Sequence, residues 1–220
     1  EMQADGILPR PVSAVAGEQG WIRSVPLTEG QREVWFGSQM DDMASCAFNE
    51  SDSVVIEGPL DSARFIAAVT AALGEQEAFR YRFDQEGQSQ WIDTDAIFEV
   101  PLLDLSGLGE NERTQHVASL LKQQALTPFD LERGPLVRAH LIKFAEGSHL
   151  FVLYCHHIVF DGYSSEIVMR RIAQLYAATE EDGATVPTSV PYSVYAYTTS
   201  ASADPEASGN ALRYWQAQYS

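Results

Sequence analysis

The most informative part of this chain is YCHHIVFDGY, residues Tyr154–Tyr163. The residues before it, from Ser148 to Cys155, are mostly apolar strand formers, as is typical of a strand that is buried on both faces. From Ser165 onward, apolar residues recur at the spacing of a helix. Two histidines, an acid and a glycine therefore lie where a buried strand is followed by a helix. Because a purely structural core does not need this polar cluster, the pattern indicates chemistry.

The two adjacent histidines are not expected to bind one metal ion together. Successive side chains of a strand point to opposite faces, so His156 and His157 cannot easily converge on one partner. A zinc site needs its ligands at roughly 2 Å from the ion. We therefore expect no metal, and we expect one histidine to serve the structure while the other faces a cavity.

The acid and the glycine that follow are expected to shape the turn. Asp161 lies four residues after His157, across a turn for which Gly162 can supply a positive φ. Ser164 or Ser165 can then cap the helix. The carboxylate can fold back to hold the loop, which would determine where the histidine ring points.

The pattern H-H-x-x-x-D-G resembles the signature of nonribosomal peptide synthetase condensation domains and of the wider chloramphenicol-acetyltransferase-like superfamily. Further segments match the condensation pattern in the same order: LTEGQREVW at Leu27–Trp35, QEAFRYRF at Gln76–Phe83, PFDLERGPLVR at Pro128–Arg138 and PYSVYA at Pro191–Ala196. In the second segment Gln76 replaces a histidine and Tyr81 a threonine, and in the last Ser193 replaces an acid. Tyr214 and Trp215 resemble the aromatic pair of the helix that follows. The resemblance covers the chain from about Leu27 to its end.

The pattern of elements predicts an α/β fold of the α+β type, with helices packed on a mixed β-sheet. A helix is expected from about Glu110 to Ala125, and antiparallel strands over Val137–Phe144 and His149–Cys155. The resemblance implies a chloramphenicol-acetyltransferase-like half-domain, because a whole condensation domain has two such halves. We therefore interpret residues 27–220 as the N-terminal subdomain, with the second subdomain absent. Residues 1–26 are expected to form a linker or arm.

Charge and composition exclude several classes of partner. The chain has 31 acidic against 14 basic residues and a net charge of -17, which argues against binding a nucleic acid. No stretch reaches the ~18 consecutive apolar residues of a membrane helix. Cys46 and Cys155 do not make a disulfide framework, so reduced thiols and a cytoplasmic location are expected. We interpret Cys155 as a small buried hydrophobe rather than as a nucleophile.

The resemblance implies that the chain takes part in amide formation. Members of the family join two carrier-bound thioesters, the amine of the acceptor attacking the thioester carbonyl of the donor. His157, the second histidine of the motif, would be catalytic. An α-amine titrates near pH 8, so roughly a tenth of it is already neutral at pH 7. We therefore expect His157 to orient the amine and to take its proton as the tetrahedral intermediate forms. The backbone amide of Gly162 is a candidate for stabilising the oxyanion.

Other residues of the motif are expected to support the site. His156 is expected to have a structural, hydrogen-bonded role. We expect Asp161 to form a buried ion pair with Arg80, with Arg82 as the second candidate; a simple helix cap is the alternative for Asp161. No cofactor is expected to bind directly. The substrates would be carried on the 4'-phosphopantetheine of donor and acceptor carrier proteins, and the missing C-terminal subdomain would be a further partner.

Two alternatives to condensation stay open. The chain could be a docking or recruitment module that kept the fold and lost turnover, or a relative that catalyses epimerisation. The intact histidine motif favours condensation, and the isolated half is expected to be inactive.

Overall fold

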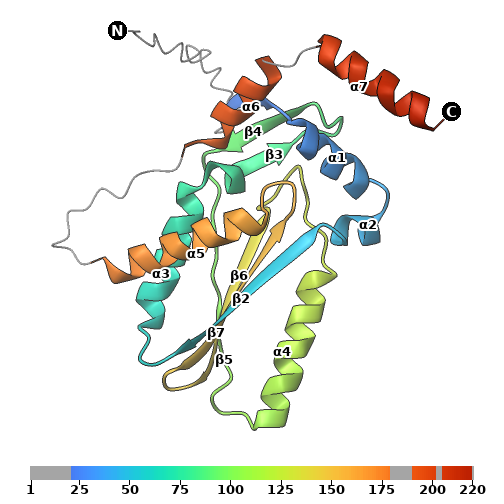
Figure 1. The fold of residues 1–220 in the computed structure, drawn as a ribbon. Helices are drawn as coiled ribbons and strands as arrows, with labels where there is room; N and C mark the ends of the chain where they lie inside the picture. The colour runs from blue at the N-terminus through green and yellow to red at the C-terminus, as the bar shows by residue number, and fades with distance from the viewer. Residues whose placement is uncertain (1–20, 179–189, 202–204, 220) are drawn as a thin grey trace.

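The computed structural model describes residues 21–178, 190–201 and 205–219, and two β-sheets form its centre (Figure 1). The larger sheet has the strand order β2-β7-β6-β5, with the bounds Asn49–Glu57, Ser148–His156, Val137–Ala145 and Leu102–Asp104. The smaller sheet has the order β1-β4-β3, with the bounds Trp21–Pro26, Ser89–Asp93 and Tyr81–Phe83. In this part of the chain β5 runs parallel to β6 and the other pairings are antiparallel, so the larger sheet is mixed.

Helices α3, Ser62–Glu75, and α5, Gly162–Ala177, cover one face of the larger sheet and pack against each other (Figure 1). The apolar side of α3 follows helical spacing, and Phe65, Val69 and Leu73 are buried. The ring of Phe65 contacts that of Phe151 on β7 edge to face, with the centroids 5.3 Å apart. This layer places the first turn of α5 beside the end of β7.

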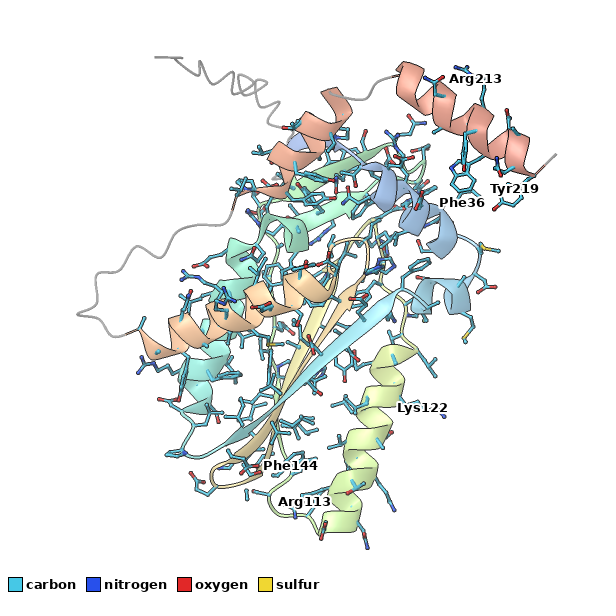
Figure 2. The ribbon with its side chains drawn as sticks, in the orientation of Figure 1. Phe36, Arg113, Lys122, Phe144, Arg213 and Tyr219 are labelled. Carbon is cyan, nitrogen blue, oxygen red and sulfur yellow. The ribbon has the colours of Figure 1, made fainter. Side chains whose placement is uncertain are left out.

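Helix α4, Glu110–Ala125, lies on the other side of the larger sheet (Figure 1). Its Arg113 donates a hydrogen bond of 2.7 Å to the carbonyl of Phe144, at the far end of β6 (Figure 2). Just beyond the helix, the carbonyl of Thr127 accepts a hydrogen bond of 2.7 Å from Arg138 of β6. The two contacts hold α4 along the sheet at both of its ends.

The remaining helical segments are α1 (Glu29–Ser38), α2 (Asp42–Cys46), the 3-10 helix η1 (Glu77–Arg80), α6 (Tyr192–Ala201) and α7 (Pro205–Gln218). With helices on both faces of a mixed sheet, the predicted fold class is confirmed. No helix in the described ranges is long and apolar enough to cross a bilayer.

The folded structure begins earlier than the sequence indicated. Strand β1, Trp21–Pro26, pairs with β4, and its Val25 is fully buried in the core. The expectation of an arm over residues 1–26 is therefore wrong for residues 21–26; residues 1–20 lie outside the described part. A short strand that pairs with a segment far along the chain has little local pattern by which to recognise it.

Strand β7 is the centre of the larger sheet, between β2 and β6. All five residues from Phe151 to Cys155 are at most 1% exposed. This agrees with the apolar run that predicted a strand covered on both faces. The strand ends at His156, so the histidine pair lies at the edge where β7 leaves the sheet.

Candidate active site

A cavity of about 1270 Å³ opens beside the turn between β7 and α5. Its walls come from α1, the end of α3, η1, this turn and the start of α6. The lining includes His157, Asp161 and Arg80, three residues that the sequence singled out for the site. Among the described residues no group of three potential metal ligands is found.

His157 is the first residue after β7, and its side chain is 41% exposed in the cavity wall. Its backbone amide donates to the carbonyl of Phe48 at 2.8 Å, which continues the pairing of β2 with β7. Its ring Nδ1 lies 2.7 Å from Oε1 of Glu50 and 2.8 Å from the carbonyl oxygen of Phe160. Since both partners are acceptors, Nδ1 carries a proton, and in the neutral ring Nε2 is left to accept one.

His156 has the opposite environment. It is fully buried, and its ring lies near the rings of Phe48 and Phe129, at centroid distances of 6.0 and 6.1 Å. Its Nδ1 accepts a hydrogen bond of 3.2 Å from the amide of Ile158. Burial, helped by the neighbouring His157, lowers the pKa of His156 to about 4, so the ring is neutral near pH 7. The prediction that the two histidines face different partners is confirmed.

Asp161 is the N-cap residue of α5. Its Oδ1 accepts hydrogen bonds from the amide of Ser164 at 2.8 Å and from the hydroxyl of the same residue at 2.7 Å. These bonds lower the pKa of the Asp161 carboxyl. The expectation that Ser164 or Ser165 caps the helix is wrong, because here the serine donates and the aspartate accepts.

The predicted ion pair of Asp161 with Arg80 is not formed, and neither is the alternative pair with Arg82, within the described part of the chain. The carboxylate is instead engaged by a serine only three residues away. Arg80 lines the same cavity, and its Nε is buried without a hydrogen-bond partner. Arg80 therefore does not support the site through an ion pair with Asp161.

Arg82 is 3% exposed and is paired elsewhere. It donates to Oδ2 of Asp93 at 2.8 Å and to the carbonyl of Tyr81 at 2.9 Å. Its guanidinium also lies against Gly134, where a Cβ would meet Nη1 at 2.4 Å. Gly134 has a φ of 55°, which favours glycine, so the glycine of the PFDLERGPLVR segment makes room for a buried ion pair.

Gly162 is the first residue of α5. The structure's positive-φ glycines in the described ranges are Gly58, Gly87, Gly134 and Gly147, so the positive φ expected at Gly162 is wrong. The turn lies earlier, over residues 157–159, where the amide of Val159 donates to the carbonyl of His156 at 3.1 Å; Asp161 follows in an extended conformation with φ -147° and ψ -177°. A Cβ on Gly162 would meet no atom within 4 Å. The residue leaves open space at the start of the helix, beside the cavity.

Sequence reasoning did not identify Glu77 as the residue that joins two of the quoted segments. Its carboxylate accepts hydrogen bonds from the amide of Ser193 at 2.7 Å and from the hydroxyl of Tyr81 at 2.6 Å. Burial, and then the bond to Glu77, raise the pKa of the Tyr81 hydroxyl. Glu77 therefore binds the first turn of α6 to η1 in the cavity wall.

A buried pair of amides joins the LTEGQREVW segment to the same wall. The side chains of Gln31 and Gln90 exchange hydrogen bonds of 3.0 and 2.8 Å, and Nε2 of Gln31 also donates to the carbonyl of Ile158 at 3.3 Å. Both glutamines are at most 5% exposed. Helix α1 is thus tied to the turn that carries His157.

Glu50 is the second site residue that sequence reasoning missed. It lies on β2 and is the cross-strand partner of Cys155, so both side chains share the face on which His157 follows two residues later. No local pattern marks such a residue, because its place depends on the register between two strands far apart in the sequence.

Comparison with protein families and curated proteins identifies relatives of this chain. The model of the condensation domain matches residues 22–220. The chain is 36% identical over 156 residues to chondramide synthase of Chondromyces crocatus, covering 70% of this chain and 4% of that protein. It is 32% identical over 201 residues to a linear gramicidin synthase of Brevibacillus parabrevis, covering 89% of this chain and 4% of that protein. The chain thus spans a small part of the length of these relatives.

Solved structures share the fold. The starter condensation domain of rhizomide synthetase superposes with a TM-score of 0.70 at 26% identity, covering 81% of this chain and 45% of that chain. The cyclization-docking bidomain of the EpoB synthetase from Sorangium cellulosum superposes with a TM-score of 0.73 at 22% identity, covering 96% and 41%. The second likeness concerns the fold alone. Because the family model matches the chain from Ile22 to its end, the chain belongs to the condensation domain family.

Proposed function

We propose that this chain supplies the histidine-bearing half of a condensation site, where a carrier-bound aminoacyl amine attacks a carrier-bound acyl or peptidyl thioester. The observation that carries the proposal is the position of His157. Its Nδ1 is hydrogen-bonded to the carbonyl of Phe160 at 2.8 Å and lies 2.7 Å from the carboxylate of Glu50, while its ring borders the cavity. A histidine held in this tautomer can accept a proton at Nε2 from a nucleophile in the cavity.

The reaction would proceed by addition and elimination. The amine nitrogen forms a bond to the thioester carbon, and the carbonyl π electrons move to the oxygen. Nε2 of His157 takes a proton from the nitrogen as this bond forms. The intermediate then collapses, the C–S bond breaks, and the departing thiolate recovers the proton from the imidazolium. An amide and a free carrier thiol result, and the histidine returns to its starting state.

Most of the benefit from His157 would come during the attack rather than before it. Supplying the neutral fraction of an α-amine at pH 7 costs only about 1.4 kcal/mol. A positioned base contributes about 10²- to 10⁴-fold. The backbone amide of Gly162, the first residue of α5, would stabilise the negative charge that develops on the oxygen, since a helix N-terminus favours an anion.

The partners belong to the same proposal. Both substrates would arrive on the 4'-phosphopantetheine of donor and acceptor carrier proteins, and a C-terminal subdomain would complete the cavity. Supporting this, the chain covers 45% of the rhizomide synthetase domain and 41% of the EpoB bidomain. Both cysteines that the structure describes are free thiols, which suits the cytoplasmic location we propose.

The test is condensation by the full-length protein that contains both halves. His157→Ala should lower the rate of dipeptidyl-carrier formation, followed by intact mass, by about 10²- to 10⁴-fold. His116→Ala is the control, since His116 is exposed on α4, across the sheet from the cavity. Undiminished product with His157→Ala would remove the proposed role. Deuterium exchange at the α-carbon of the aminoacyl group, without amide formation, would indicate epimerisation instead.

A further inference from the structure

The strand register holds Glu50 rigidly beside His157. Nine consecutive residues of β2 pair with β7 without a bulge, from Asn49 opposite His156 to Glu57 opposite Ser148. The hydrogen bond from the His157 amide to the carbonyl of Phe48 extends this pairing by one residue. The backbone of Glu50 therefore has little freedom to move relative to the histidine.

The two side chains approach each other at ion-pair distance. Oε1 of Glu50 lies 2.7 Å from Nδ1 of His157. The two side chains are 37% and 41% exposed, and of the two His157 lines the cavity. The hydrogen bond of the same Nδ1 goes to the carbonyl of Phe160, at 2.8 Å.

The two acceptors have different effects on the ring. The carbonyl of Phe160 suffices to keep the proton on Nδ1, but it carries no net charge. The carboxylate of Glu50 adds a full negative charge on the side of the ring away from Nε2. When Nε2 takes a proton, the ring becomes a cation, and a carboxylate in contact with it stabilises that cation more than a carbonyl does.

We propose that Glu50 is a positioning residue for the condensation reaction: it orients the ring of His157 and stabilises the imidazolium that forms when the amine is deprotonated. This inference rests on the proposed function of His157. Glu50 does not touch the substrate in this scheme, and it acts through the histidine.

The other charged groups near His157 are engaged in different contacts. The Asp161 carboxylate accepts from Ser164 at the start of α5, and that of Asp52, two residues after Glu50 on the same face of β2, accepts from the hydroxyl of Ser165. His156 is neutral near pH 7, because burial lowers its pKa to about 4.

Elsewhere in the cavity wall Arg80 is positively charged, and Glu29, Glu33, Glu75 and Glu77 are acidic. Glu75 pairs with Arg171, and Glu77 accepts a hydrogen bond from the amide of Ser193 in α6. In the described part of the chain, Glu50 is the carboxylate that pairs with the ring of His157.

The experiment compares variants of Glu50 in the full-length protein with both halves. Glu50→Gln keeps the shape and an acceptor oxygen but removes the charge, whereas Glu50→Ala removes both. We expect Glu50→Gln to lower kcat by about 10- to 100-fold, the range that hydrogen bonds to charged groups span, and Glu50→Ala to lower it further. KM for the acceptor carrier should change little, because the residue does not contact substrate.

A double-mutant cycle with His157→Ala separates positioning from a merely structural role. If Glu50 acts through the histidine, Glu50→Gln should cause no further loss once His157 is alanine. A structural role would instead lower the rate by the same factor in both backgrounds. Asp52→Asn is the matched control, since it removes the same charge from the same strand face without touching His157; its rate should stay near that of the wild type.

The outcomes distinguish the inference from the function on which it rests. Wild-type rates in both Glu50 variants, with His157→Ala inactive, would refute the role of Glu50 and leave the proposed function intact. Equal losses for Glu50→Gln with and without the histidine would refute it too. Full activity of His157→Ala would refute the proposed function itself. Should Glu50→Ala fail to fold, the near-isosteric Glu50→Gln still decides between these outcomes.

Discussion

The carboxylate of Glu77 accepts a hydrogen bond from the backbone amide of Ser193 at 2.7 Å, across 116 positions of sequence. The Ser193 hydroxyl donates to the other carboxylate oxygen at 3.1 Å. A side chain of η1 thus caps α6, although the QEAFRYRF and PYSVYA segments contain no local signal of this contact. Two of the segments that resemble the family therefore contact each other in the wall of the cavity.

Glu77→Ala should destabilise the chain. The substitution leaves the amide of Ser193 and the hydroxyl of the fully buried Tyr81 without an acceptor. We expect the free energy of unfolding to fall by about 1–3 kcal/mol, the cost of leaving buried polar groups unpaired. Urea unfolding measures this. Glu86→Ala, which removes an exposed acid next to the β3–β4 turn, should change stability by less than about 0.5 kcal/mol. Equal effects of the two variants would contradict the capping role.

Gly134→Ala should be costly. With a φ of 55°, the position is in the left-handed region, where a side chain costs roughly 1–2 kcal/mol. The new Cβ would also lie 2.4 Å from Nη1 of Arg82, whose ion pair with Asp93 would have to shift. Thermal unfolding should show a clear loss of stability.

A second glycine gives the comparison for Gly134. Gly74 lies in the last turn of α3, one residue before its end, and a Cβ there would meet no atom within 4 Å. Gly74→Ala is therefore expected to leave the stability unchanged or to raise it by at most about 0.5–1 kcal/mol, because alanine favours a helix over glycine. Similar melting temperatures for the two variants would show that a side chain at position 134 costs no stability, which contradicts the prediction.

Asp161→Ala should destabilise α5 in a pH-dependent way. Removing an N-cap aspartate costs about 1 kcal/mol. Hydrogen bonds from Ser164 lower the pKa of Asp161 in the folded chain, so the ionised form contributes stability above the ordinary aspartate pKa of about 3.9. This contribution is lost as the pH falls through the lowered pKa.

The measurement for Asp161 is the stability difference between wild type and variant across acidic pH. It should be complete at pH 6 and shrink below about pH 4, where the carboxyl takes up a proton in the unfolded chain while it is still ionised in the folded chain. Asp161→Asn is the control, since asparagine is an equally good N-cap without a charge. A difference that stays constant down to pH 2 would argue against the ionised cap.

His156 should make the folded chain sensitive to mild acid. Burial lowers its pKa to about 4 in the folded state, whereas an unfolded histidine binds a proton below about pH 6.5. The unfolded chain therefore binds more protons in this window, and stability falls as the pH is lowered through it. The free energy of unfolding should drop by on the order of 3 kcal/mol between pH 7 and pH 4 from this residue alone.

The variant His156→Asn removes the titrating ring while keeping an acceptor for the Ile158 amide. Its unfolding free energy should depend less steeply on pH between 4 and about 6.5. His116→Asn, at an exposed histidine of α4, should leave the slope unchanged. Parallel pH profiles for wild type and His156→Asn would show that the buried ring is not the source of acid sensitivity.

Local sequence pattern was sufficient for the elements that depend on their own residues. The helix predicted from Glu110 to Ala125 is α4, and the apolar run before the histidines is β7, extended by one residue to His156. The opposite orientation of His156 and His157 followed from the two-residue period of a strand. These features need no knowledge of any distant segment.

Side-chain partners are harder to predict, because they depend on which distant segments become neighbours. The sequence favours an arginine from another segment as the partner of Asp161, but a serine in the next turn reaches it first. The composition of residues 1–26 indicates an arm, whereas residues 21–26 form β1, whose partner strand β4 lies far along the chain.

The sequence by itself determined that a buried central strand ends in two histidines followed by a helix, since apolar periodicity is a property of consecutive residues. Only the tertiary structure decided that Glu50 lies 2.7 Å from His157 and that Glu77 caps α6. Those contacts depend on strand register and on the packing of η1 against α6, which are far apart in the sequence. Ion pairs and hydrogen bonds of this length act only over a few ångströms, so the role of each carboxylate depends on which residue the folded chain places next to it.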